Sequence, residues 1–491
     1  ATNGLAQAHW EMHGWVLLLL AWFFVPFYHS SGVFTMPEFL EKRFDSRSRW
    51  VLSIVSLIAY VFTKVSVTVY AGAVVFQALL PDTFGSSENA FWVGAFTTVV
   101  LTGIYTVFGG MRAVIYTEVV QTGILILGSV LITYFGLSRL GGWSELVATA
   151  RPNAQSFALW RPLSDINFPW LGVVVASIVI GVWYWCTDQY IVQRTLAAKD
   201  LKNARRGAIW GGALKILPVF IFLVPGMIGW ALHQKGLVAM PVKGDGINKD
   251  TVFPALVAAL LPVGVRGLVV AGLLSALMSS LASLFNSCAT LFTVDIYEKL
   301  RPGQSQKTLV RVGRIATVVV VGFGLIWIPV MKIVTEKSNG LYDYLQNVQG
   351  FLAPPIFAVF ILGLFSRRVN ARGAYVGLLT GFVAGMIKLT LQTLQKSDVI
   401  SSDSFLGAIG AYNGYYACGW LTLLSILTIV LVSLSSPAPT TAKLLNMTFH
   451  TLDADKRAQW RSSIGLADIL GTLAVLGIIL SGYLYFSFWL S

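Results

Sequence analysis

The sequence predicts an all-α integral membrane protein in which residues 1–491 form a single transmembrane domain. Of its 491 residues, 56% are apolar and only 12% are charged, whereas a soluble globular protein carries about 25% charged residues. Apolar stretches of roughly 20 residues, the length that crosses a hydrocarbon core as a helix, follow one another along the whole chain. The basic residues are also sorted between alternate loops, as in proteins that cross a membrane many times.

Twelve apolar stretches are long enough to span a membrane as helices. The second and the seventh exceed the usual length, which predicts tilted helices or helices that extend beyond the bilayer. In chain order, the predicted spans are 12–28, 51–79, 91–108, 114–135, 170–190, 208–232, 266–294, 310–334, 341–364, 373–394, 412–434 and 465–489.

The Lys and Arg residues are unevenly divided between the loops that these spans define. One alternating set of loops holds 22 of the 35, and the other set holds nine. Because basic residues collect in cytoplasmic loops, the richer set is predicted to face the cytoplasm. The net charge of +13 therefore indicates an orientation, and it gives no reason to expect nucleic acid as a partner. The richer set comprises loops 29–50, 109–113, 191–207, 295–314, 365–372 and 435–464.

The sequence lacks the signatures of common enzymes. It contains no GxSxG, HExxH or Walker A motif, and no GxGxxG that follows a strand. Cys186, Cys288 and Cys418 are far apart and lie in apolar stretches, so they suggest neither disulfides nor a zinc site. An enzyme is therefore the least favoured class.

The fifth predicted span combines aromatic and polar side chains over 181–190, GVWYWCTDQY. Such a cluster suits a pyranose, because the apolar face of the sugar stacks on an aromatic ring while its hydroxyls bond to groups such as Asp188 and Gln189. An aromatic belt at the membrane interface is the simpler alternative, but a belt would not require the carboxylate and the amide.

The seventh predicted span carries hydroxyls at Ser275, Ser279 and Ser283 along one helical stripe, with Ser280 beside them. Neutral hydroxyls and backbone carbonyls are suitable ligands for a hard cation such as Na⁺. Close packing of helices through small residues explains the same stripe equally well. Lys215 lies well inside the sixth span, where a charge is costly and by default indicates a functional site.

Seven segments, in the expected order, resemble the sodium/solute symporter family and, within it, the sodium/glucose cotransporter branch. The resemblance runs from residue 1 to about 433. It implies an inverted-repeat (LeuT-like) transporter bundle of fourteen spans, of which twelve are visible, with the chain beginning just after the first core helix of the family. The segments are 24–28 with 35–44, 109–122, 183–199, 214–228, 275–297, 343–355 and 367–381.

The resemblance also implies a sugar site at mid-membrane. Glu11 matches the acid that accepts hydrogen bonds from sugar hydroxyls, Lys215 the lysine that donates to them, and Gln346 the glutamine that contacts the ring. Tyr184 and Trp185 match an inner gate, in which the tyrosine covers the sugar from the cytoplasmic side.

Sodium sites are implied in the same way. The carbonyl of Ala276 and the hydroxyls of Ser279 and Ser280 match the sodium site that the family shares. Ser283 and Glu118 match the serine and the aspartate of members with a second sodium.

The chain departs from the family pattern at four positions. Gly181 replaces Asn or Thr, His13 replaces a small polar residue near the site entrance, Ala282 replaces a hydroxyl residue of the second ion site, and Glu118 is one methylene longer than Asp. The first two substitutions bear on sugar preference and the last two on sodium stoichiometry.

The resemblance implies sodium-coupled symport of a neutral hexose, of the glucose or galactose type, into the cytoplasm. The alternatives are symport of inositol, another polyol or sialic acid, and a sodium-gated sugar sensor that does not accumulate its ligand. The implied partners are Na⁺, a small sugar and the lipid bilayer of a cell membrane, either a plasma membrane or a bacterial inner membrane.

Overall fold

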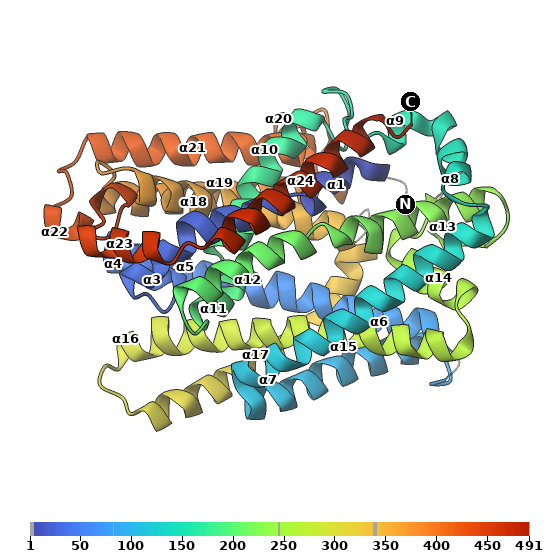
Figure 1. The fold of residues 1–491 in the computed structure, drawn as a ribbon, viewed down its shortest axis with the longest axis horizontal. Coiled ribbons are helices and arrows are strands. Elements are labelled where there is room, and N and C mark those ends of the chain that lie inside the picture. Colours follow the sequence, from blue (N-terminus) through green and yellow to red (C-terminus); the bar gives the residue numbers. More distant parts are fainter. Residues whose placement is uncertain (1–3, 82, 244–245, 337–340, 491) are drawn as a thin grey trace.

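The computed structural model describes residues 4–81, 83–243, 246–336 and 341–490, and these residues are almost entirely helical (Figure 1). Twelve helices in the described chain are long and apolar enough to cross a membrane, so the predicted number of spans is confirmed. Their bounds are Gly4–Ser31, Ser46–Leu79, Ser87–Phe108, Ile115–Leu140, Trp170–Thr187, Leu201–Gln234, Val263–Leu300, Gln306–Lys332, Tyr344–Phe365, Ala371–Lys396, Gly414–Leu434 and Leu466–Phe488.

The spans and the connections between them are built from α-helices. In the first half of the chain these are α1 (Ala8–Glu11), α2 (Trp15–Leu19), α3 (Val25–Ser31), α4 (Met36–Arg43), α5 (Ser46–Ala59), α6 (Ser66–Leu79), α7 (Ser87–Leu140), α8 (Trp143–Ala150), α9 (Ala154–Phe157), α10 (Trp170–Val182), α11 (Gln189–Leu196) and α12 (Leu201–Leu214). In the second half they are α13 (Val224–Gln234), α14 (Val252–Leu260), α15 (Val263–Thr290), α16 (Glu298–Leu300), α17 (Gln306–Glu336), α18 (Leu341–Phe365), α19 (Ala371–Lys396), α20 (Phe405–Ala411), α21 (Gly414–Leu434), α22 (Thr441–Leu444), α23 (Ala454–Ser462) and α24 (Leu466–Phe488).

Several spans contain a wider, π-helical stretch, an interruption that is frequent at functional sites. These stretches are η2 (Leu20–Phe24), η3 (Tyr60–Val65), η5 (Trp183–Thr187), η6 (Val219–Leu223) and η8 (Leu291–Tyr297). Short 3₁₀ turns are η1 (Gly4–Gln7), η4 (Arg151–Asn153), η7 (Lys249–Thr251) and η9 (Phe449–Thr451), and the strands β1 (Val242–Lys243) and β2 (Gly246–Ile247) form one antiparallel pair.

Helix α7 differs from the prediction, which placed a loop at 109–113 between the third and fourth spans. The structure has one helix of 54 residues over Ser87–Leu140. A straight α-helix of that length would measure about 80 Å, far more than the ~30 Å of a hydrocarbon core. In Figure 1 the two halves of α7 run in opposite directions, so α7 supplies both the third and the fourth span.

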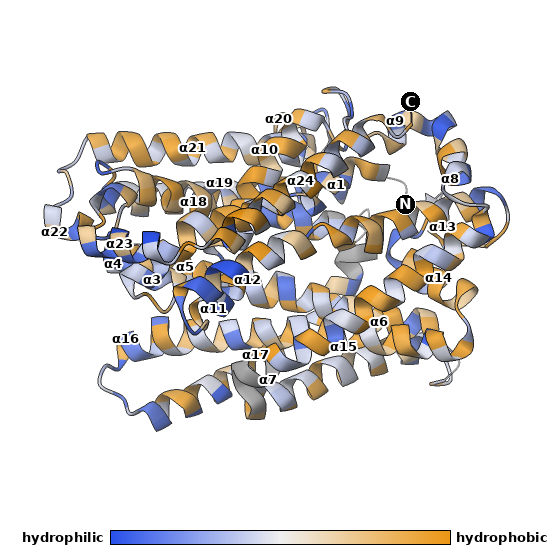
Figure 2. Cartoon of the chain, viewed as in Figure 1, coloured by the Kyte–Doolittle hydropathy of each residue, from blue (hydrophilic) through white to orange (hydrophobic). Residues whose placement is uncertain are grey.

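The ends of the molecule reflect the predicted sorting of charge. Figure 1 shows α4, α11, α16, α22 and α23 toward one end, whereas α8, α9 and the C-terminus lie toward the other. The first group belongs to the loops that are richer in Lys and Arg, and Figure 2 shows hydrophilic residues gathered there, with apolar residues along the helices between the two ends.

A row of glycines on α19 allows α21 to pack closely against it. A Cβ atom at Gly377 would lie 2.2 Å from Ile429 Cγ1, and one at Gly373 would lie 2.0 Å from Ser433 Oγ. Small residues at such intervals are typical of helix contacts in membranes. Further along α19, Gly385 lies against the backbone of Phe351 in α18.

Candidate functional site: a polar cavity between four spans

All five residues predicted to bind sugar line one cavity of about 200 Å³. The cavity lies between the first span, the α10–η5 segment, the end of α12 and the start of α18. Its lining is Trp10, Glu11, His13, Ile180, Gly181, Tyr184, Trp185, Lys215, Leu345, Gln346 and Gln349. Residues more than 300 positions apart in sequence therefore meet at one place.

Lys215 and Glu11 form an ion pair across the cavity. Lys215 follows the last residue of α12 as its C-cap, a position where a cation is favoured by the helix dipole. Its Nζ also lies 5.8 Å from the centre of the Trp185 ring. Because the two charges balance each other, the lining offers both a donor and an acceptor while its net charge stays near zero.

The predicted gate residues Tyr184 and Trp185 lie on the π-helical stretch η5. Their rings meet edge to face at 5.1 Å, and the Tyr184 ring lies 6.2 Å from that of Tyr190. Helical geometry ends directly after η5, where Asp188 adopts an extended conformation before α11 begins. A discontinuous helix of this kind is a common support for a transport site.

The buried polar atoms of the lining without a hydrogen-bond partner among the described residues include the acceptor Oε1 of Gln346 and the donor Nε1 of Trp10. An unpaired buried group costs about 1–3 kcal/mol, so this pair favours a ligand that can both donate and accept. A sugar hydroxyl does both. The sequence analysis did not foresee a role for Trp10, although it adjoins Glu11.

His13 occupies the space beside Gly181. A Cβ atom at Gly181 would lie 3.0 Å from His13 Nδ1, closer than ordinary van der Waals contact. On its other side, the His13 ring accepts a hydrogen bond at Nε2 from the Trp185 indole N–H, at 3.3 Å. The two departures from the family pattern therefore belong together: the imidazole fills the room that the missing side chain leaves, and it bonds to Trp185, a predicted gate residue.

Asp188 and Gln189, which the sequence analysis expected to face a sugar, do not line the cavity, and that expectation was wrong. Asp188 forms an ion pair with Lys64 and accepts hydrogen bonds from the Tyr60 hydroxyl and the Tyr190 amide. Gln189 accepts a hydrogen bond from the amide of Met36. Both side chains fix the start of α11 instead.

The residues predicted to bind sodium lie on α15, apart from Glu118 on α7. Ser279 and Ser283 each donate a hydrogen bond to Glu118 Oε1, at 2.9 and 3.0 Å. Ser280 hydrogen bonds with the side chain of Tyr190, whose ring neighbours that of Tyr184, a predicted gate residue. Ala276 precedes this group by one helical turn on α15.

Arg194 joins the same cluster, and the sequence analysis missed it because it assigned this residue to a cytoplasmic loop. Its guanidinium contacts both oxygens of Glu118, at 2.7 and 3.3 Å. It also donates to the hydroxyl of Ser283 at 2.5 Å and to the backbone carbonyl of Tyr190 at 2.7 Å. The only available sequence signal was its position, six residues after Asp188.

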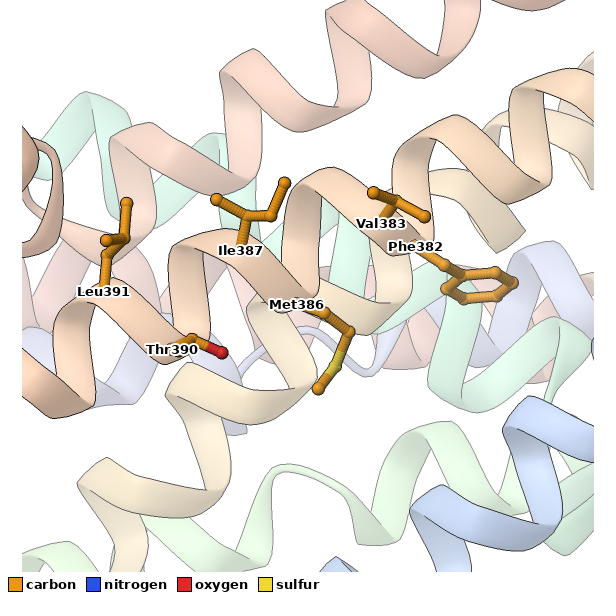
Figure 3. A pocket seen from close by; sticks show the side chains of 6 residues that line it. All are labelled: Phe382, Val383, Met386, Ile387, Thr390 and Leu391. Carbon is orange, nitrogen blue, oxygen red and sulfur yellow. The ribbon is translucent and has the colours of Figure 1, made fainter.

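A larger hollow of about 400 Å³ lies on the surface of α19, and Figure 3 shows its side chains. All of its lining residues come from that one helix, and all but Thr390 are apolar. It lacks the convergent polar groups of a ligand site. An exposed apolar hollow on a membrane span is a surface suited to lipid.

Comparison with known proteins identifies the family of the chain. Residues 1–381 match the profile of the sodium:solute symporter family. The chain belongs to that family. A sodium/glucose cotransporter 4 from Danio rerio is 36% identical over 480 residues, which cover 92% of this chain and 71% of the relative. A sodium/mannose cotransporter from Bos taurus is 38% identical over 468 residues, covering 90% and 76%.

Solved structures show the same fold. A Na⁺-coupled sialic acid symporter in a substrate-bound, outward-open state superposes with a TM-score of 0.70 at 23% identity, covering 88% of this chain and 86% of that one. A transporter of the nucleobase-cation-symport-1 family gives 0.51 at 14% identity, with 91% and 90% covered. The predicted LeuT-like fold is thus confirmed, and the symporter is a multi-pass membrane transporter rather than an enzyme.

Proposed function

We propose that this symporter couples the inward movement of Na⁺ to the uptake of a neutral hexose. The cavity carries the proposal, because it combines aromatic rings, a balanced Glu11–Lys215 pair and the two unpartnered atoms of Trp10 and Gln346. The relatives named as sodium/glucose and sodium/mannose cotransporters support the same substrate class.

Each part of the cavity has a place in sugar binding. Glu11 would accept hydrogen bonds from the sugar hydroxyls and Lys215 would donate hydrogen bonds to them. The hydroxyls would thus bind between two side chains that already form an ion pair. Gln346 contacts the ring from α18, and Tyr184 with Trp185 covers it from the side of η5. Aromatic faces favour the apolar face of a pyranose, while the polar groups orient its hydroxyls.

Charge favours a neutral hexose over sialic acid. Lys215, the cation of the lining, is paired with Glu11, so the carboxylate of an acidic sugar would meet a group that is already neutralised. Binding would then require breaking the pair and leaving Glu11 uncompensated, which is costly in a partly buried site. Neutral polyols such as inositol have no carboxylate that would break the pair, so they serve as comparison substrates.

Sodium would bind on α15, at the carbonyl of Ala276 and the hydroxyls of Ser279 and Ser280. Tyr190 links this region to the gate, because it hydrogen bonds with Ser280 and lies against Tyr184. An ion there therefore favours the arrangement of the gate that holds the sugar. By linkage, sodium and sugar must raise each other's affinity by the same factor, and the membrane potential adds about 2.3 kcal/mol per charge for each 100 mV.

Transport then follows alternating access. Sodium stabilises the outward-facing state, the sugar enters, and movement of one helix group against the other opens the cytoplasmic side. The test is uptake of labelled hexoses, inositol and sialic acid into vesicles with and without an inward sodium gradient. Accumulation of a hexose that requires the gradient supports the proposal. Binding without accumulation would identify a sensor, and uptake without sodium dependence would contradict coupling.

A further inference from the structure

The environment of Arg194 bears on how many sodium ions accompany each sugar. Its guanidinium faces Glu118 with two nitrogens, Nη2 to Oε1 at 2.7 Å and Nε to Oε2 at 3.3 Å. Two parallel contacts of this kind are the strongest arrangement between an arginine and a carboxylate. Both side chains are about one quarter exposed, so water screens the pair only in part.

The remaining oxygens of the cluster are also engaged. The Ser283 hydroxyl accepts from Arg194 and donates to Glu118, and the Ser279 hydroxyl donates to Glu118 as well. The backbone carbonyl of Tyr190 accepts from Arg194 Nη1. A hard cation needs several oxygen ligands at once, and the Glu118 carboxylate, the Ser283 hydroxyl and the Tyr190 carbonyl already serve the guanidinium.

The chain thus supplies its own cation at this place. Arg194 is covalently attached one turn after Tyr190, so it competes with sodium at a high local concentration whatever the ionic composition of the solution. A sodium ion at Glu118 would displace the guanidinium and leave that charge without its carboxylate, which is expensive in a partly buried setting. Ala282, fully buried beside Ser283, adds no hydroxyl that could offset the loss.

We propose that Arg194 is the fixed cation of the Glu118 site, so that no transported sodium binds there and one sodium ion moves with each sugar. This inference rests on the proposed function and deepens it. It assigns Glu118 to a permanent ion pair with Arg194, to which the Ser283 hydroxyl bonds on both sides, and this cluster joins α11, α7 and α15. The region of Ala276, Ser279 and Ser280 is left as the place of the coupled ion.

The first experiment measures the stoichiometry of the unmodified, full-length protein. In reconstituted vesicles, ²²Na⁺ and labelled hexose fluxes are compared directly, and the hexose accumulation is measured at several imposed potentials. We expect one sodium per sugar and a sodium dependence without cooperativity. Two sodium ions per sugar would overturn the inference while leaving the proposed function intact, whereas the absence of sodium-driven uptake would contradict the function itself.

The second experiment changes the fixed cation. Arg194→Gln frees the carboxylate, so we expect an additional ²²Na⁺ ion to bind to the purified protein, and Arg194→Gln with Glu118→Gln should lose it again. Arg194→Lys keeps a positive charge and should retain a single ion. Sodium binding that stays at one in Arg194→Gln would overturn the inference. If Arg194→Gln does not fold, the single ion expected in Arg194→Lys and in the unmodified protein still decides.

Discussion

Gln346 and Lys215 contribute to the cavity through different physical effects. The Oε1 atom of Gln346 has no partner in the described part of the chain, so a sugar hydroxyl that donates to it gains a hydrogen bond at no loss elsewhere. Lys215 is already paired with Glu11, so its removal leaves a carboxylate uncompensated. The two residues should therefore differ in the size of their effects.

Gln346→Ala should weaken sugar binding by about 1 kcal/mol, which corresponds to about a fivefold lower affinity. Lys215→Ala should weaken it further, because Glu11 loses its partner. Both variants should insert and fold normally, since each only shortens a side chain that lines a cavity. Equilibrium binding of labelled hexose measures the effect. Gln395→Ala, on the exposed end of α19, is the matched control, and normal binding in both cavity variants would show that the sugar site lies elsewhere.

Ser280→Ala removes one hydroxyl from the proposed sodium site without creating a buried charge. We expect the sodium concentration that gives half-maximal uptake to rise, with little change in the amount of protein in the membrane. Thr428→Ala serves as the control, because it removes a half-buried hydroxyl of α21 that bonds to the Leu424 carbonyl of the same helix. Unchanged sodium activation in Ser280→Ala would remove this residue from the ion site.

Lys64 and Asp188 form the most enclosed ion pair near the gate. Their side chains are 7% and 1% exposed, and Lys64 Nζ lies 4.6–5.2 Å from the centres of four aromatic rings, those of Tyr60, Trp183, Tyr184 and Tyr190. A cation among aromatic faces is favourable when it is desolvated. The pair links the second span to the break before α11, next to the gate.

Asp188→Asn should destabilise the symporter by roughly 3–5 kcal/mol, because it leaves Lys64 buried without its counter-charge. Lys64→Met combined with Asp188→Asn should recover most of that loss, since no unpaired charge remains. Thermal unfolding in detergent measures both variants against Asp403→Asn on the surface. Equal destabilisation in the single and the double variant would contradict this account, because the cost would then not come from the charge.

At the scale of elements, the contact between α19 and α21 depends on residues without side chains. The glycines of α19 repeat every fourth residue from Gly373 to Gly385, so they line one face of the helix. Because lipid is as apolar as the helices themselves, close packing is what holds such spans together.

Gly377→Leu should prevent this approach, since even a Cβ atom would overlap Ile429. We expect a lower melting temperature and less monodisperse protein on size-exclusion chromatography. Gly267→Leu in α15 is the matched control, because nothing lies within 4 Å of a Cβ atom at that position. A Gly377→Leu protein as stable as this control would mean that α19 and α21 can separate without loss.

The spans could be predicted from sequence because length and apolar character determine what crosses a membrane. The absence of a loop inside α7 could not be predicted, because the composition of residues 109–113 is compatible with a loop as well as with a helix. Arg194 was misjudged for a related reason: α11 continues the fifth span beyond its break at Asp188, so a residue assigned to a loop lies against α7 and α15.

At the scale of the whole molecule, the proposed sugar cavity depends on contacts between residues that are far apart in the sequence. The residues that line it come from positions 10 to 349, and no local pattern shows that they meet. The family resemblance supplied the five predicted lining residues, one at a time. It could not supply Trp10 or the partner of His13, because these depend on which neighbouring side chains leave space and which polar atoms remain without a bond.

The contact between Gly181 and His13 also restricts how the sugar site can change over generations. A side chain gained at position 181 would push aside the imidazole, which stands 3.0 Å from where its first carbon would be. A smaller residue at position 13 would make room instead, but it would remove the acceptor of the Trp185 indole. Either route disturbs the contact that holds Trp185, so a change at position 181 is expected to alter the proposed gate together with the sugar contact.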